Sequence, residues 1–214
     1  MKKIQCCQPL GNAWLTIRGI CDIMISDLLT GVNDMKTKDL IMIALFTALI
    51  SVGAFIKIPV PVCPFTLQFL FTTLAGVILG GKKGAISVAL YLVIGLMGMP
   101  VFTSGGGIGY IFQPTFGYLI GFFFGTYLTG KIANSGAPSF KRLLGACFAG
   151  LFVVYALGMA YYWVISKFYL GTPIGIFPLF LYCFILAVPG DILLCILSAE
   201  LGRRVLPVTN KITA

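Results

Sequence analysis

One acidic residue lies within an apolar stretch near the C-terminus. Asp191 is the charged residue of the sequence VPGDILL (residues 188–194), and apolar residues continue on both sides of it. A carboxylate at bilayer depth costs several kcal/mol unless a partner compensates for it, so it usually faces a cavity, another helix or a ligand. We interpret Asp191 as a contact for a ligand with N–H donors; a structural hydrogen bond to a neighbouring helix is the alternative.

Other polar side chains lie where apolar segments begin. The glycine-rich stretch at residues 103–109 (TSGGGIG) carries no charge and is followed by Tyr110, Gln113, Thr115 and Tyr118. Glycines let backbone amides approach a ligand closely, so this stretch is predicted to bind a ligand, with a plain flexible loop as the alternative. Gln68 lies near the start of another apolar segment, at about residues 66–80. We expect its side chain to face inward, because an amide that faces lipid is costly.

Composition excludes several kinds of chemistry. The chain has no histidine, which removes Ser-His-Asp hydrolysis, histidine zinc sites and histidine proton relays. The cysteines lack the spacing of a metal site, so we interpret them as small apolar residues or free thiols. Residues 76–82 resemble a phosphate loop, but Lys83 stands where a Ser or Thr is required. We therefore expect no metal, no cofactor and no ATP hydrolysis by this chain itself.

The elements that position these residues are predicted to be membrane helices. Of 214 residues, 59% are hydrophobic and only 10% are charged, whereas soluble domains are about 25% charged. At roughly 20 residues per span, the length leaves space for about six or seven helices and no soluble domain. The net charge of +9 is better explained by basic cytoplasmic loops than by nucleic-acid binding.

Six apolar segments follow a distinct N-terminal extension. They cover about residues 39–57, 66–80, 84–100, 112–130, 143–166 and 174–202. The predicted fold class is therefore an all-α membrane protein, with six transmembrane helices in a domain at residues 35–214. Residues 1–34 are predicted to be either an amphipathic helix on the membrane surface or a segment upstream of a natural start at Met35.

The basic residues predict how these helices are oriented. With both termini in the cytoplasm, 13 of the 15 Lys and Arg residues lie inside, several of them in tight turns such as residues 80–84 (GGKKG), and only Lys57 and Lys167 lie outside. This distribution follows the positive-inside rule. It places the proline-rich segment 58–64 on the outer face together with the glycine-rich stretch. Asp191 opens toward them if the preceding Pro-Gly pair interrupts its helix.

Two sets of small residues are spaced for close helix packing, which in lipid depends on van der Waals contact. Gly117, Gly121 and Gly125 repeat at every fourth position and favour a packing groove inside the bundle over a homodimer interface. Ala44 and Ala48 form a second pair, for which chance in an alanine-rich span is at least as good an explanation on the pattern alone.

Taken in order, the motifs of this chain resemble the BioY family, the biotin-specific substrate-capture (S) subunits of energy-coupling-factor (ECF) transporters. The resemblance covers about residues 36–207. It is carried by residues 59–68 (PVPVCPFTLQ), 79–80 (LG), 90–92 (LYL), 98–102 (GMPVF), 113–122 (QPTFGYLIGF) and 189–191 (PGD). The combination is specific, although each piece alone is not.

The resemblance implies an ECF S-component-like bundle of six helices in the plasma membrane, with a biotin site at the outer face. It also implies a complex with an integral-membrane coupling (T) subunit and two cytoplasmic ABC ATPases. ATP hydrolysis by these partners is expected to topple the S subunit and release the vitamin inside. Ala44 and Ala48 match the Ala-xxx-Ala patch with which such subunits dock the coupling subunit.

The chemistry of biotin then gives a predicted binding site. Its ureido ring has two N–H donors and a carbonyl acceptor, so Asp191 is expected to accept an N–H in a charge-assisted hydrogen bond. Gln68, Thr115 or loop amides are expected to serve the carbonyl, and aromatic side chains to wall the rest of the ligand. The predicted ligand-binding residues are Gln68, Tyr91, Phe102, Gly106, Gly107, Thr115, Tyr118 and Asp191.

Three positions depart from the family pattern. The Lys often found three residues after the aspartate is Leu194 here, the Asn sometimes found in the glycine-rich loop is absent, and Leu119 stands in place of a basic residue. The ligand carboxylate then lacks an obvious cation, unless Lys57 or Lys167 folds over the outer mouth or loop amides form an anion nest. A related ligand such as a biotin precursor therefore stays open.

The predicted function is the capture of biotin or a close analogue and its delivery inward by an ATP-driven complex, without covalent chemistry by this chain. The first alternative is a standalone secondary transporter for a small neutral solute, although a proton- or sodium-coupled carrier is expected to show more than one intramembrane carboxylate. The second is an intramembrane enzyme, against which the missing histidine and the lack of paired carboxylates argue.

Overall fold

The computed structural model describes residues 35–58, 65–136, 139–168 and 188–213, so the predicted extension 1–34 lies outside the described residues. The described ranges hold α2 (Thr37–Phe55), α3 (Gln68–Leu79), α4 (Gly81–Leu96), α5 (Phe116–Ala133), α6 (Phe140–Phe168) and α8 (Val188–Thr213). The predicted all-α class is confirmed. Two short elements were not predicted: the strand pair β1 (Lys57–Ile58) and β2 (Phe65–Thr66), and the 3-10 helix η1 (Ile108–Phe112).

The helices α2 and α6 are each long and apolar enough, by length and composition, to cross a membrane. The shorter α3 has 12 residues, which is fewer than the roughly 20 needed to span a bilayer alone. Its residues are almost all buried inside the bundle. This helix therefore serves as a core element around which longer helices pack.

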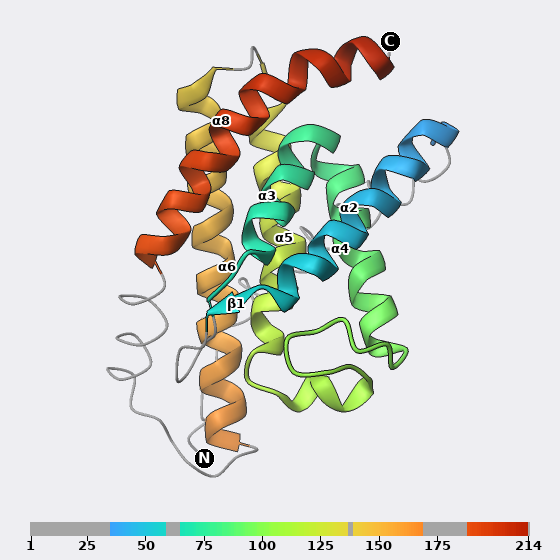
Figure 1. The fold of residues 1–214 in the computed structure, drawn as a ribbon. Coiled ribbons are helices and arrows are strands. Elements are labelled where there is room, and N and C mark those ends of the chain that lie inside the picture. The colour runs from blue at the N-terminus through green and yellow to red at the C-terminus, as the bar shows by residue number, and fades with distance from the viewer. Residues whose placement is uncertain (1–34, 59–64, 137–138, 169–187, 214) are drawn as a thin grey trace, which may run out of the picture. The chain divides into compact units, whose positions relative to one another are not determined.

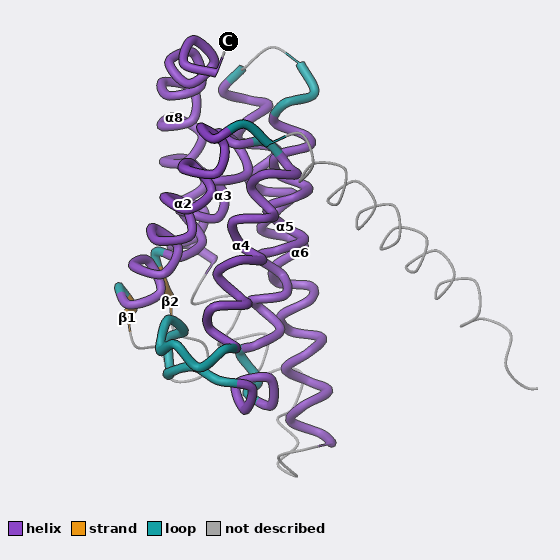
Figure 2. The backbone as a smooth tube through the Cα atoms, turned by 90° about the vertical axis from the view of Figure 1, so that its right-hand side faces the viewer, coloured by secondary structure: helices purple, strands orange, loops and turns teal. Residues whose placement is uncertain are grey.

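Two neighbouring helices, α3 and α5, lie at the centre of the bundle. The helix α5 packs against α3, α4 and α6, while α3 also contacts α2 and α8. In Figure 1 the α3–α4 turn and the last turns of α5 and α8 lie at one end, with the starts of α2 and α6. The strand β1 and the segment between α4 and α5 lie at the opposite end, which is also visible in the rotated view of Figure 2. The segment between α4 and α5 thus lies at the end of the bundle opposite the α3–α4 turn.

The glycines of α5 form the contact with α6. A Cβ added at Gly121 would lie 2.9 Å from the Val154 main chain, and one at Gly125 would lie 3.0 Å from the Gly150 carbonyl oxygen. Gly117 is covered in the same way by the base of the Tyr161 side chain. The predicted packing groove inside the bundle is confirmed, because α6 occupies this face.

The predicted tight turn between the second and third apolar segments is present, but it is confined to Gly80 and does not extend over residues 80–84. Gly80 alone reverses the chain, with φ = +85°, and α4 begins at the next residue. The other two glycines of the motif serve close packing: a Cβ on Gly81 would lie 2.7 Å from the Tyr127 carbonyl oxygen, and one on Gly84 would lie 2.9 Å from the Ala75 carbonyl oxygen. The glycine-rich run at residues 80–84 is therefore the place where α3, α4 and α5 meet.

The C-terminal helix ends later than predicted. The structure describes α8 from Val188 to Thr213, and residues 174–187 of the predicted span lie outside the described residues. Pro189 lies in the first turn, where proline is tolerated because no N–H bond is lost. The helix start thus coincides with the Pro-Gly pair that was predicted to interrupt it.

Two of the cysteines are described, and both are buried. Cys147 on α6 and Cys195 on α8 are free thiols without exposed surface. They confirm the interpretation as small apolar residues for these two positions; the other five cysteines lie outside the described residues.

The α5–α6 contact predicts a position-specific effect of alanine. We expect Gly121→Ala to lower the free energy of unfolding by about 1–3 kcal/mol, because the new methyl group meets main-chain atoms that cannot move aside. Gly145→Ala on α6 is the matched control: a Cβ there meets nothing within 4 Å, so the substitution should be neutral or stabilising by about 0.5–1 kcal/mol. Unfolding in detergent measures both, and equal effects would contradict the packing described.

Candidate functional site

Asp191 lies in the first turn of α8 and is only 8% exposed. The Tyr155 hydroxyl on α6 donates a hydrogen bond to its Oδ2 at 2.5 Å. The start of a helix also favours a negative charge, because the first N–H groups point toward it. The alternative reading of this residue, a structural hydrogen bond to a neighbouring helix, is therefore observed. An ionised carboxylate accepts about four hydrogen bonds, so the bond to Tyr155 leaves other positions for a ligand.

Tyr155 is a functional candidate that the sequence analysis missed. Its ring meets that of Tyr118 edge-on, with centroids 6.2 Å apart and planes at 89°. Gly158 makes this approach possible, since a Cβ there would collide with the Tyr118 ring. The sequence contains only a weak signal for Tyr155. A buried tyrosine needs a hydrogen-bond partner for its hydroxyl, but no residue near Tyr155 in the sequence indicates that this partner is Asp191. The structure thus joins predicted Tyr118 and Asp191 through one unpredicted side chain.

A second cluster forms where α4 meets the segment that follows it. Tyr91 is fully buried, and its ring lies edge-on to that of Phe102 with centroids 5.4 Å apart. Phe102 in turn lies 4.6 Å from the ring centroid of Tyr110. The Tyr91 hydroxyl donates to the Val101 carbonyl oxygen at 3.1 Å. The predicted pair Tyr91 and Phe102 is therefore brought together, with Tyr110 as a third ring beside Phe102.

Hydroxyl groups join this aromatic cluster to the start of α5. The hydroxyls of Tyr110 and Thr103 share a hydrogen bond of 2.9 Å, and those of Tyr110 and Thr115 one of 3.4 Å. Tyr110 also packs on Phe116, with ring centroids 6.5 Å apart. Phe116 and Tyr118 both lie in the first turn of α5. The two aromatic clusters consequently meet at this helix start, and predicted Thr115 lies between them.

The glycine-rich segment packs closely on the last turn of α4. The Gly107 N–H donates to the Gly95 carbonyl oxygen at 2.8 Å, and Gly107 has φ = +103°. A Cβ on Gly95 would collide with the ring of Phe102, and one on Gly106 with the Met99 carbonyl oxygen. These glycines therefore hold the aromatic cluster against α4. Contacts of Gly106 and Gly107 with a ligand stay a prediction.

Gln68 is the first residue of α3 and is 1% exposed. The expectation that it faces inward is confirmed. Its Nε2 makes no hydrogen bond of good geometry to the described residues, although the amide interacts with the Tyr91 hydroxyl. A buried donor left unpaired costs about 1–3 kcal/mol. This amide is thus a polar group whose hydrogen bonds a ligand is able to complete.

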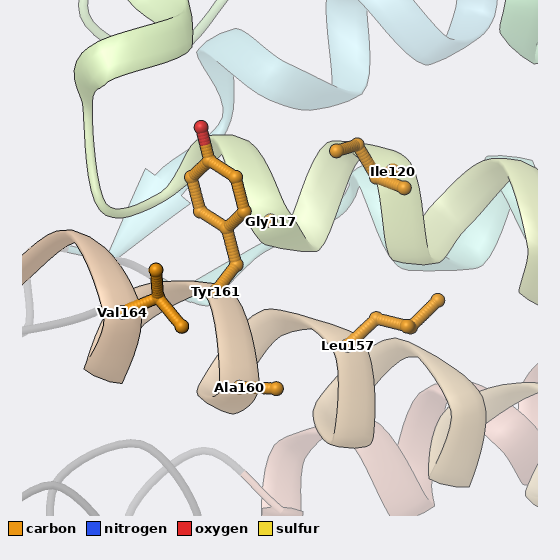
Figure 3. Close-up of a pocket in the computed structure, with 6 residues that line it drawn as sticks. All are labelled: Gly117, Ile120, Leu157, Ala160, Tyr161 and Val164. Carbon is orange, nitrogen blue, oxygen red and sulfur yellow. The ribbon is translucent and has the colours of Figure 1, made fainter. Parts of the chain in front are cut away.

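A pocket of about 290 Å³ lies elsewhere, between α5 and α6 (Figure 3). Its wall is almost wholly apolar and includes none of the predicted site residues. The lining side chains come from facing turns of the two helices: Gly117, Ile120, Leu157, Ala160, Tyr161 and Val164. Ala160 and Val164 are exposed, so this depression belongs to the outer surface of the helix pair rather than to the cluster around Asp191.

The structure also shows the exposure of three further residues from the sequence analysis. Ala44 and Ala48 are both exposed on α2, where Leu40, Ile41 and Leu45 are exposed as well. Their role in docking stays a prediction. Leu194 is only 6% exposed and packs in the apolar core.

Comparisons with known proteins agree on one family. A profile described as the BioY family matches residues 27–211. A probable biotin transporter BioY of Lysinibacillus sphaericus is 44% identical over 82% of this chain and 90% of that protein. The biotin transporter BioY of Thermotoga maritima is 45% identical over 57% of this chain and 72% of that protein. The crystal structure of the S-component for biotin from an ECF-type ABC transporter matches with a TM-score of 0.66 and 31% identity, over 80% of this chain and 94% of that one.

The bond between Tyr155 and Asp191 is measurable as a coupling energy. In a double-mutant cycle of Tyr155→Phe and Asp191→Asn, we expect the free energy of unfolding to show a coupling of about 1.5–3 kcal/mol, the range for hydrogen bonds to charged groups. The control cycle combines Asp191→Asn with Tyr161→Phe. The Tyr161 hydroxyl donates its hydrogen bond to the Ile111 carbonyl oxygen and not to Asp191. A coupling as small as in the control would show that the two groups do not interact.

Proposed function

The chain belongs to the BioY family, and from this premise we infer that it is the biotin-binding S component of an ECF-type vitamin transporter. It is accordingly a membrane protein of a transporter family. The observation that carries the binding role is Asp191, a buried carboxylate at a helix start whose position is fixed by the Tyr155 hydroxyl. Such a group recognises N–H donors strongly, because the acceptor is charged and shielded from water.

We propose that the ureido ring of biotin binds between Asp191 and Gln68. Asp191 accepts a ureido N–H, and the fixed bond from Tyr155 keeps the carboxylate oriented for it. The Gln68 Nε2 donates to the ureido carbonyl, which gives the buried amide the partner it lacks among the described residues. Tyr91, Phe102 and Tyr118 enclose the apolar part of the ligand, and Thr115 holds Tyr110 at the rim.

The proposed complex also contains a coupling (T) subunit and two cytoplasmic ABC ATPases. The exposed pair Ala44 and Ala48 on α2 supports a docking face, because small side chains allow close helix approach in lipid. We propose that both termini are cytoplasmic and that the site opens at the outer face of the plasma membrane. The concentration of basic residues at one end of the bundle supports this orientation.

The proposed role is capture and delivery, with no bond made or broken by this chain and no cofactor. A biotin precursor with the same ureido ring is the second candidate ligand, favoured by the buried Leu194 where a cation for the carboxylate would otherwise stand. A standalone secondary transporter differs from both, because it would move its solute without ATPases. Transport assays with and without the partner subunits separate these alternatives.

Isothermal titration of biotin into the purified chain tests the ligand and the site. We expect tight binding by the parent chain and roughly 10- to 100-fold weaker binding by Asp191→Asn, which loses a charge-assisted hydrogen bond. Glu200→Gln is the matched control, since Glu200 pairs with Arg204 on the same helix at 2.8 Å and should leave affinity unchanged. Equal affinity in all three would demote Asp191 to a structural role; no binding by the parent would direct the search to precursors.

If α2 docks the coupling subunit, substitutions on α2 should impair assembly of the transporter without changing the affinity for biotin. Ala44→Leu and Ala48→Leu should leave biotin affinity unchanged but reduce copurification with the coupling subunit, because the larger side chains hold the helices apart. Ala156→Leu is the control, as Ala156 is an exposed alanine on α6. Unimpaired copurification of the two α2 variants, or an equal defect in the control, would rule out this face as the docking surface.

A further inference from the structure

The side chain of Lys57 links two outer segments of the bundle. Lys57 belongs to β1, where it pairs with Thr66 in the short hairpin. Its exposed ammonium group donates a hydrogen bond to the Thr103 carbonyl oxygen at 2.8 Å. Thr103 is part of the glycine-rich segment that packs on α4. A cation is thus held over the segment that carries the aromatic cluster.

The ammonium group lies at the rim of the proposed site. Thr103 follows Phe102 directly, and its hydroxyl bonds to that of Tyr110, which bonds in turn to Thr115. An ammonium group has three N–H donors, and one is directed at the Thr103 carbonyl oxygen. The other two have no partner among the described residues and are therefore available to an anion at the exposed edge of this network.

The distribution of charge selects Lys57 among the cations of the described residues. Most of them lie beside the α3–α4 turn, at the starts of α2 and α6 or near the ends of α5 and α8: Lys36, Lys38, Lys82, Lys83, Lys131, Lys141, Arg142, Arg203 and Arg204. Figure 1 shows these element ends together, opposite β1 and the α4–α5 segment. Lys167 ends α6 but lies over the rings of Trp163 and Phe168, 4.9 and 5.8 Å from their centroids.

We propose that Lys57 recognises the carboxylate of the ligand, so that the two polar ends of biotin are bound by groups of opposite charge. This inference rests on the proposed function, since it assumes a ligand with a ureido ring at one end and a carboxylate at the other. Asp191 binds the ring within the bundle, and the Lys57 ammonium pairs with the carboxylate at the mouth. The bond to Thr103 positions the ammonium before the ligand arrives.

Because Lys57 is exposed, its contribution to the affinity for biotin should be modest and should depend on ionic strength. An ion pair in contact with water is weakened by dissolved salt, whereas the buried contacts of the ureido ring are not. The affinity for biotin should therefore fall as ionic strength rises, and part of this dependence should disappear when Lys57 is replaced. A residue that only braces the loop would not produce a salt dependence tied to the charge of the ligand.

The test compares biotin with biotin amide, which keeps the ureido ring and the apolar chain but has no negative charge. In titrations with the full chain, we expect Lys57→Met to bind biotin roughly two- to fivefold more weakly than the parent, as for loss of a solvent-exposed ion pair. Biotin amide should bind both proteins equally, which also shows that the variant is folded. Lys57→Arg should restore most of the affinity, and Lys167→Met should behave as the parent.

Each other outcome overturns the proposal in a recognisable way. An equal loss for biotin and biotin amide would mean that Lys57 only holds the glycine-rich segment through Thr103. Unchanged affinity for both ligands would mean that it does not contribute, and a loss confined to Lys167→Met would assign the carboxylate to that residue. If the parent chain bound neither ligand, the proposed function itself would fail, and this is seen before any variant is compared.

Discussion

A buried carboxylate needs hydrogen-bond donors, and this constraint organises the binding end of the bundle. Asp191 is met by the Tyr155 hydroxyl from α6 and lies in the first turn of α8. Among the Lys and Arg residues whose side chains the structure describes, none is buried, so none of these cations neutralises the group inside the bundle. Uncharged donors must stabilise it, and a ligand that brings N–H groups is a favourable addition. In the proposed site, the same feature that costs stability without a ligand would favour a cyclic urea, whose N–H groups supply the missing donors.

The close approach of helices makes this arrangement possible. Gly121 and Gly125 let α5 contact the main chain of α6, and Gly158 on α6 receives the Tyr118 ring. Tyr118 and Tyr155 are then near enough to pack edge-on, which fixes the hydroxyl that faces Asp191. In lipid such packing replaces the hydrophobic effect as the force between helices. The glycines thus support recognition without a contact of their own with the ligand.

The fold and part of the site were predictable from the sequence because their signals are local. Apolar segments indicate helices, and a single acid in such a segment indicates a special position, as Asp191 does. Tyr155 was missed because its meaning depends on a partner 36 residues away. The turn predicted over residues 80–84 is confined to Gly80; its length was overestimated because glycine serves both turns and close packing, and only tertiary contacts distinguish them. The bond from Lys57 to Thr103 joins residues 46 positions apart, and no local pattern predicts it.

The two ends of the site differ in depth, and this difference bears on how a ligand enters and leaves. The carboxylate of Asp191 is shielded from water, so its hydrogen bonds are strong, and in the proposed site release of the ligand would require the helices around it to move. The ammonium of Lys57 is exposed, so its pairing is weak and quickly exchanged. An amphiphilic solute with a urea ring and a carboxylate would first meet the cation and then exchange water for the buried contacts. Capture would then be graded from the surface inward, whereas release depends on the packing of α6 and α8 around the aspartate.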